Sequence, residues 1–291
     1  MLRWTSAGAV SAPTTVQIRA EPGASGSPRA GAPAPGRALT PHELLDNLHH
    51  FTEGLRTPRT QPCTALVLSG AAVSRRPDLP AALAQAAAWG LTRVTLHAAP
   101  DDTRESLAPL LGALQRVVVP VEDSAGVAAM PVPAAQAAVL VPLARLAPGA
   151  EASLAAALAR VHPAGVTLSL PFPVEAQAPP PLGPVRAALD VLLPPLVAAG
   201  VDVVVKGLPA CFLGPWAARA HRTPNRWYVD DAHQRAAALL FTPGVISWQK
   251  DDHCRFCAAD GRCDGVFSAW SRQPGRPPTR PLDADLRPID G

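Results

Sequence analysis

Short apolar runs rich in β-branched residues alternate along the chain with longer runs rich in alanine and leucine. The short runs are typical of buried strands, and they lie at 16–20, 64–68, 93–97, 117–121, 137–143, 165–170 and 201–206. The longer runs have helical spacing, and they lie at roughly 40–55, 79–89, 103–115, 151–161 and 185–199. Thr40-Pro41-His42-Glu43 opens the first of these helices with a capping residue, a proline and a glutamate.

This alternation predicts an α/β fold. Repeated βα units form a parallel sheet with crossover helices, and six or seven strands are fewer than a closed eight-fold barrel needs. We therefore expect a partial (β/α)6 TIM-like barrel over residues 16–206. Residues 1–15 are expected to form a flexible N-terminus, and 21–39 a loop without periodicity, rich in alanine, glycine and proline.

The pattern changes after Gly207, where the regular alternation ends. Tryptophans stand at 216, 227, 248 and 270, and one helical run is expected over roughly 230–241. We predict a small cysteine-containing C-terminal subdomain over 207–275, followed by an irregular, proline-rich tail over 276–291.

Composition narrows the function classes. The 35 prolines and 21 glycines exclude a coiled coil. The net charge is +3 without an arginine cluster, which argues against nucleic acid as a partner. No long uncharged apolar run and no apolar leader segment is evident, so we expect no membrane association and a cytoplasmic protein. Five cysteines, an odd number, favour a reducing compartment over a disulfide framework.

Three cysteines near the end of the chain have the spacing of a metal-binding loop. Cys254, Cys257 and Cys263 form a C-x2-C-x5-C pattern, and Cys211 follows a predicted strand and supplies a fourth thiolate. Four thiolates suit either a tetrahedral zinc ion or one [4Fe-4S] cluster, and spacing alone does not separate these alternatives. His253 or Asp264 could replace Cys211 as a ligand.

These cysteines resemble the auxiliary-cluster segment, called SPASM or twitch, at the C-terminus of many radical S-adenosylmethionine (radical SAM) enzymes. Residues 66–98, LVLSGAAVSRRPDLPAALAQAAAWGLTRVTLHA, are similar to the second βα unit of that superfamily, and Thr40 to Leu55 would match its first helix. The resemblance covers about residues 14–275. It implies a radical-SAM-like partial barrel followed by a SPASM/twitch-like metal-binding subdomain.

Two departures from the family pattern bear on catalysis. The superfamily holds its catalytic cluster with a C-x3-C-x2-C motif after the first strand, and the corresponding residues Glu21 to Gly31 include no cysteine. Gly70-Ala71-Ala72-Val73 stands where the family has the Gly-Gly-Glu-Pro turn that binds the cofactor's amino group. Phe267 also replaces the next cysteine of a full SPASM module, so at most one auxiliary cluster can form.

The resemblance and its departures together imply a pseudoenzyme that is not expected to bind S-adenosylmethionine. We expect one auxiliary iron–sulfur cluster on Cys211, Cys254, Cys257 and Cys263, and a role as an accessory or substrate-presenting partner. The partner would be an active radical SAM enzyme or a peptide or protein substrate. The alternatives are a structural zinc-binding module, or an enzyme that uses the remaining cluster for redox chemistry.

Overall fold

A computed structural model of the chain divides into two compact units. The N-terminal unit comprises residues 1–27, 33–119 and 224–242, and the C-terminal unit comprises 28–32, 120–223 and 243–291. The structure describes residues 4–5, 8–9, 13–22, 36–54, 61–170, 181–242, 248–271 and 279–289. Most of the predicted loop at 21–39, and parts of the predicted N-terminus and tail, lie outside these residues.

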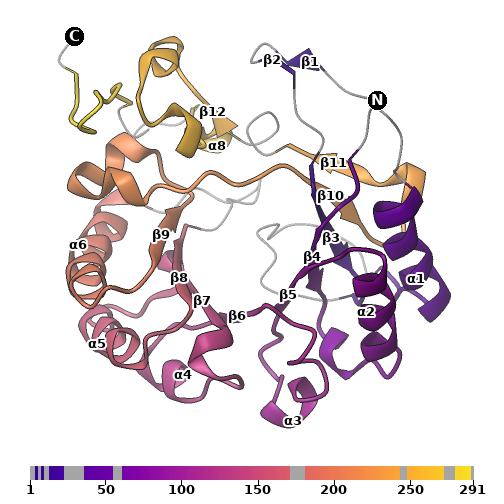
Figure 1. Cartoon of the computed structure of the whole chain (residues 1–291). Helices are drawn as coiled ribbons and strands as arrows, with labels where there is room; N and C mark the ends of the chain where they lie inside the picture. Colours follow the sequence, from indigo (N-terminus) through magenta and orange to yellow (C-terminus); the bar gives the residue numbers. More distant parts are fainter. Residues whose placement is uncertain are drawn as a thin grey trace. The chain divides into compact units, whose positions relative to one another are not determined.

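The N-terminal unit contains a mixed sheet in the order β11-β10-β3-β4-β5-β6 (Figure 1). The strands β3 (Thr15–Arg19), β4 (Ala65–Ser69), β5 (Arg93–His97) and β6 (Arg116–Pro120) are parallel and confirm the predicted strands of this part of the chain. On the other side of β3, β10 (Arg226–Val229) is also parallel, and β11 (Leu239–Phe241) pairs with it in the antiparallel sense. A separate pair, β1 (Trp4–Thr5) and β2 (Gly8–Ala9), is antiparallel.

Three helices follow the strands of this unit. The predicted first helix is confirmed as α1 (Pro41–His49), whose Thr40 and Glu43 form a capping box, and a π-helical turn continues it at His50–Gly54. The second is confirmed as α2 (Leu79–Ala88). The helix expected over 103–115 is mostly wrong: only α3 (Arg104–Leu107) is α-helical, because Pro109 and Gly112 interrupt the run.

The C-terminal unit contains the parallel strands β7 (Ala137–Pro142), β8 (Gly165–Ser169) and β9 (Val203–Lys206), paired in that order. The helices α4 (Ser124–Ala128), α5 (Glu151–Val161) and α6 (Leu182–Ala198) pack side by side beside these strands (Figure 1). All three strands, α5 and α6 match the predicted segments, whereas α4 was not predicted. The described strands of each unit form an open sheet.

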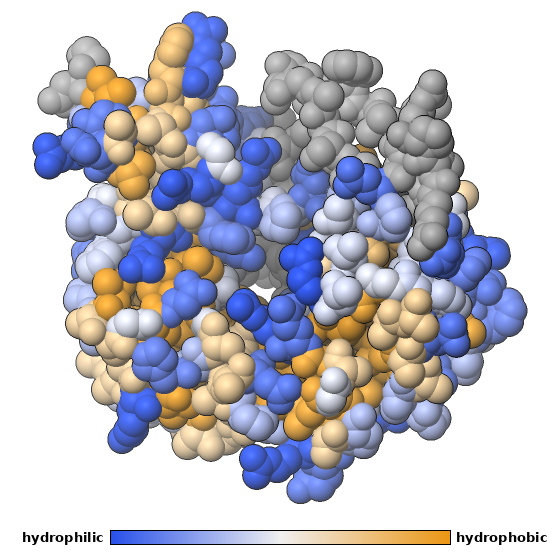
Figure 2. All heavy atoms as spheres, in the orientation of Figure 1, coloured by the Kyte–Doolittle hydropathy of each residue, from blue (hydrophilic) through white to orange (hydrophobic). Residues whose placement is uncertain are grey.

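Burial alternates along four of the parallel strands, β5, β6, β7 and β9. In β7 every second residue is buried, beginning with Ala137, and the residues between are half-buried. One face of each strand therefore packs into a core, and the helices supply the matching apolar stripe, such as Leu79, Ala82, Leu83 and Ala86 of α2. Figure 2 shows hydrophilic residues interspersed with apolar ones over the helices on the visible face.

The segment after β9 departs from the predicted pattern. The helix expected over 230–241 is wrong, because the Asp230 side chain accepts hydrogen bonds from the backbone of Ala232 and His233 in a turn, and residues 239–241 form β11. Further on, β12 (Trp248–Gln249) pairs with β13 (Val266–Phe267), and the short helix α8 (Ser268–Ser271) follows. The predicted boundaries at 207, 275 and 276 stay predictions.

Candidate functional site

The three clustered cysteines lie on one loop closed at its base by a strand pair. We call residues 250–265, which connect β12 with β13, the cysteine loop. Trp248 pairs with Phe267 across the two strands, and their rings stack with centroids 3.9 Å apart. Phe267, where the resemblance to a SPASM module would place a cysteine, is thus part of the aromatic base of the loop. Short 3₁₀ turns at Asp252–Phe256 and Asp260–Arg262 fold the loop between these ends.

Backbone amides donate hydrogen bonds to two of the sulfur atoms. The N–H groups of Ala210 and Gly265 each donate to Cys263 Sγ at 3.3 Å, and the N–H of Leu282 donates to Cys257 Sγ at 3.3 Å. Such N–H···S contacts favour the thiolate form and are typical of sulfur atoms that bind a metal or an iron–sulfur cluster. The contact of Ala210 with Cys263 brings Cys211, its neighbour in the sequence, beside the cysteine loop.

The four thiols act on one another electrostatically. Burial raises the pKa of Cys211, and the charge of Cys257 adds to this increase. Burial likewise raises the pKa of Cys254, with Cys263 and Cys211 acting in the same direction. For Cys263, burial raises the pKa, while the amides of Ala210 and Gly265 and the charge of Lys250 lower it. Mutual repulsion of this kind is what a shared cation would relieve.

The chain beyond the cysteine loop packs back onto it. Ala258 N–H donates to the carbonyl of Leu282 at 2.9 Å, while Leu282 N–H donates to Cys257, so the two segments exchange hydrogen bonds. The Thr279 hydroxyl also donates to the Asp251 carboxylate. Residues 279–282 thus cover the first half of the cysteine loop.

The donor set fits a metal or cluster in its chemistry. Four thiols with backbone donors on two of the sulfurs match the ligands of zinc and of a four-iron cluster. Among the residues that the structure describes, no three His, Cys, Asp or Glu side chains are gathered as the ligands of a metal ion. Metal binding by Cys211, Cys254, Cys257 and Cys263 therefore stays a prediction.

The two alternative ligands have other partners. Both oxygens of the Asp264 carboxylate accept a hydrogen bond from Thr223 N–H, at 2.9 and 3.1 Å, and the residue is 4% exposed. His253 is exposed, with its ring 3.9 Å from Asp251. The isolated Cys63 is buried in the N-terminal unit, where burial raises its pKa to about 12. Asp264 is thus engaged by Thr223, and Cys211 stays the predicted fourth ligand.

The backbone of residues 70–73, where the resemblance would place a cofactor-binding turn, contacts another segment of the chain. Gly70, directly after β4, has φ +141°, and a Cβ atom there would lie 2.7–2.8 Å from the backbone of Glu21. Ala71 N–H donates to the carbonyl of Pro22 at 3.4 Å. The main chain that follows β3 therefore lies directly against residues 70–71 and engages one of their backbone donors. Ala72 and Val73 continue into a 3₁₀ turn, in which Val73 is buried.

Arg76 connects this turn with the start of α1. Its guanidinium contacts the Glu21 carboxylate at 2.9 Å, the Leu39 carbonyl at 2.7 Å and the Asp78 carboxylate at 2.7 Å. The residue is 8% exposed, so these three acceptors replace its hydration. Arg76 and Asp78 belong to the R-P-D-L sequence that carries the resemblance, but the structure places them in an internal network.

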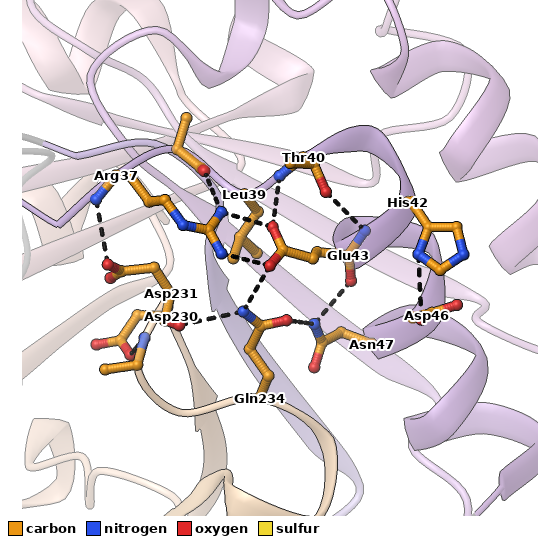
Figure 3. A network of polar contacts seen from close by, with 12 residues as sticks. Arg37, Leu39, Thr40, His42, Glu43, Asp46, Asn47, Asp230, Asp231 and Gln234 are labelled. Carbon is orange, nitrogen blue, oxygen red and sulfur yellow. Dashed lines mark hydrogen bonds and ion pairs between the residues drawn. The ribbon is translucent and has the colours of Figure 1, made fainter.

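A second polar network joins the start of α1 to the β10–β11 connection (Figure 3). The Glu43 carboxylate accepts hydrogen bonds from Arg37, Thr40 N–H and the Gln234 amide, and Asp231 accepts one from Arg37 N–H at 3.1 Å. The arginine beside Glu43 lowers the pKa of that carboxyl well below its usual range. The charged groups of this network thus have partners within the unit. Sequence reasoning missed it because it joins residues about 190 positions apart.

Comparisons with known proteins do not assign the chain to a family. No family model matches the sequence, and no curated protein matches it either. Among the helices that the structure describes, none combines the length and apolarity needed to span a bilayer.

Proposed function

We propose that this protein is a non-catalytic, radical-SAM-like accessory protein that binds one [4Fe-4S] cluster. Cys211, Cys254, Cys257 and Cys263 would hold the cluster, on a scaffold of the partial-barrel type. The observation that carries the proposal is the group of four thiols, which act on one another electrostatically and of which Cys257 and Cys263 accept backbone N–H hydrogen bonds. When bound, such a cluster supplies one-electron redox capacity or cross-links the segments that ligate it.

The region around Gly70 supports the non-catalytic part of the proposal. A cofactor that binds at the end of a parallel strand needs free backbone donors and open space there. Here Ala71 N–H has an intramolecular acceptor, and the backbone of Glu21 lies within contact distance of Gly70. Together with the lack of cysteine in residues 21–31, this argues for a scaffold without S-adenosylmethionine chemistry.

Two other functions use the same cysteines. A structural zinc ion would stabilise the cysteine loop, which has few long elements of its own, without redox activity. An enzyme that works through the single cluster would need an iron atom with an exchangeable ligand, which requires that Cys211 is not bound to it.

Metal and acid-labile sulfide analysis on anaerobically purified protein tests the proposal first. We expect about four iron and four sulfide per chain with broad absorption near 400 nm, since four thiolates complete a four-iron cluster. A parallel titration with S-adenosylmethionine should show no binding. Zinc without iron would replace the proposal with the structural module, and binding or cleavage of S-adenosylmethionine would contradict the non-catalytic assignment.

The fourth ligand is tested by Cys211→Ala, with Cys63→Ala as the matched control. Cys211 interacts with the thiols of the cysteine loop, whereas Cys63 is a buried thiol in the other unit. We expect Cys211→Ala to lose or destabilise the metal centre and Cys63→Ala to retain it. Unchanged metal content in Cys211→Ala would indicate an open site and favour the redox enzyme.

The accessory role is tested by mixing the protein with candidate active radical SAM enzymes. An accessory protein should change the turnover of one of them, and the effect should disappear with Cys254→Ala/Cys257→Ala protein if the metal centre is required. No effect on any of these enzymes would count against the accessory role while leaving the cluster assignment intact.

A further inference from the structure

One of the chain's two lysines contacts the turn that leads into Cys263. Lys250 Nζ donates to the backbone carbonyl of Asp260 at 2.8 Å and to the Asp260 carboxylate at 2.6 Å. Asp260 begins the 3₁₀ turn Asp260–Arg262, and Cys263 is the next residue. A single ammonium therefore binds both a main-chain and a side-chain oxygen at the start of this turn. We call this double contact the Lys250–Asp260 bridge.

The position of Lys250 is fixed from its other side as well. Lys250 follows Gln249 at the end of β12, and Gly265 precedes Val266, the partner of Gln249 in β13. Gly265 has φ +94°, and a Cβ atom there would collide with the Gln249 carbonyl and lie 2.9 Å from Lys250 Cγ. The lysine stem thus packs against Gly265, whose N–H donates to Cys263 Sγ. Lys250 contacts the chain on both sides of Cys263.

We propose that Lys250 is the positioning residue for Cys263: its bridge to Asp260 fixes the turn before this ligand, and its stem packs against Gly265, which donates to the sulfur. The inference rests on the proposed function, because it assigns to Lys250 an effect on the metal centre that the four cysteines would hold. A positive charge near a ligand sulfur stabilises the state with more negative charge, which is the reduced form of a cluster.

Lysine suits this position better than arginine. Its tetrahedral ammonium directs separate N–H bonds to two oxygens of one residue, and its charge is compact. Of the 26 basic residues in the chain only Lys206 and Lys250 are lysines, so a lysine here stands out against a strong preference for arginine.

Three substitutions separate charge from positioning. Lys250→Met keeps the stem against Gly265 but removes the ammonium, Lys250→Arg keeps the charge, and Asp260→Asn keeps the ammonium but removes its anionic partner. Arg262→Met is the control, because Arg262 is an exposed cation adjacent to Cys263 in the sequence and lies outside the Lys250–Asp260 bridge. Far-ultraviolet circular dichroism checks that each variant is folded.

Two measurements on the anaerobic protein then follow: the rate of metal release to a chelator, and the midpoint potential of one-electron reduction by dithionite with redox mediators. Losing a partly exposed charge-assisted hydrogen bond should speed release about fivefold in Lys250→Met and Asp260→Asn. The potential should fall in Lys250→Met, rise in Asp260→Asn, and return toward the wild-type value in Lys250→Arg. A purely structural bridge would change the release rates without moving the potentials in opposite directions.

The outcomes also separate this inference from the proposed function. Wild-type protein with a cluster, combined with Lys250→Met that matches Arg262→Met in release rate and potential, would overturn the role of Lys250 alone. Zinc in place of iron would overturn the cluster, and the release rate of zinc would then decide whether Lys250 positions Cys263. Wild-type protein that binds neither metal would overturn both.

Discussion

Replacing Arg76 with methionine should destabilise the N-terminal unit strongly, because Arg76 is a buried cation with three acceptors. The substitution retains most of the apolar stem but removes the contacts to Glu21, Asp78 and the Leu39 carbonyl. Those acceptors lie on three separate segments, so their loss loosens the connection between β3, the start of α1 and α2.

The size of the expected stability loss follows from the burial of the three charged side chains. The side chains of Arg76, Glu21 and Asp78 are 7%, 17% and 22% exposed, so the two carboxylates would remain in a partly desolvated site without their cation. Removing one partner of a buried ion pair costs about 3–5 kcal/mol, and the partial exposure of the carboxylates favours the lower end. We therefore expect a loss of about 3 kcal/mol, which lowers the urea midpoint by about 1 M.

The neighbouring arginine provides the control. Arg75 forms an ion pair with Asp101 at the same 2.7 Å distance, but the two side chains are 44% and 64% exposed. Arg75→Met should leave the urea midpoint, followed by circular dichroism, close to that of the wild type, because solvent screens exposed pairs. Hydrogen exchange over residues 36–54 should increase in Arg76→Met and not in Arg75→Met.

Equal urea midpoints for Arg76→Met and the wild type would refute the reasoning, since they would show that the contacts of Arg76 do not stabilise the unit. Equal losses of stability in Arg75→Met and Arg76→Met would also contradict it, because the expected difference comes from burial and not from the distance between the charged groups.

Three further substitutions test other parts of the N-terminal unit. Gly70→Ala should lower the free energy of unfolding in urea by roughly 2 kcal/mol, because Gly70 has a positive φ and a Cβ there would contact Glu21. Gly112→Ala is the control and should be neutral or slightly stabilising, because a Cβ there meets nothing within 4 Å. Equal effects of the two substitutions would contradict this reasoning. Burial, with Arg235 and His49, lowers the pKa of His50, so the folded state disfavours its protonation and loses stability as pH falls below about 6.5. His50→Gln should therefore show a smaller drop in urea midpoint between pH 7.5 and 5.5 than the wild type, and an equal drop would count against it. Asn47→Ala should cost about 2 kcal/mol, because the fully buried amide bonds Glu43, Gln234 and Arg235; a midpoint unchanged from the wild type would show that these bonds are dispensable.

The sequence predicts a strand well where the residues of that strand by themselves favour the extended backbone. The run RVTLH at 93–97 is β-branched, alternates in burial and forms β5 with the predicted bounds. In contrast, β10 has the sequence RWYV and begins two residues after Pro224, and its partners in β3 are Val16, Gln17 and Ile18 at the other end of the chain. A local pattern holds no information about so distant a partner, so this strand was not predicted.

The cysteine loop also combines features that a local sequence pattern predicts with contacts from distant residues that it does not predict. The spacing of Cys254, Cys257 and Cys263 predicts a loop that gathers sulfur atoms, because spacing is a local property. The donors that reach these sulfurs come from Ala210 and Leu282, and the cation comes from Lys250. Backbone amides have no signature in the sequence, and Lys250 differs from an ordinary surface lysine only through the fold around it.

The placement of β10 beside β3 has a consequence for how the protein is made. The N-terminal unit includes residues 224–242, so a ribosome must synthesise the first three strands of the C-terminal unit before this sheet can be completed. Until then, the outer edge of β3 exposes unpaired backbone groups, which can pair with other nascent chains. A fragment that stops at residue 206 would retain this open edge permanently. Expression of the predicted barrel alone should therefore give aggregated material, whereas a fragment that extends through β11 contains the strand that covers the edge.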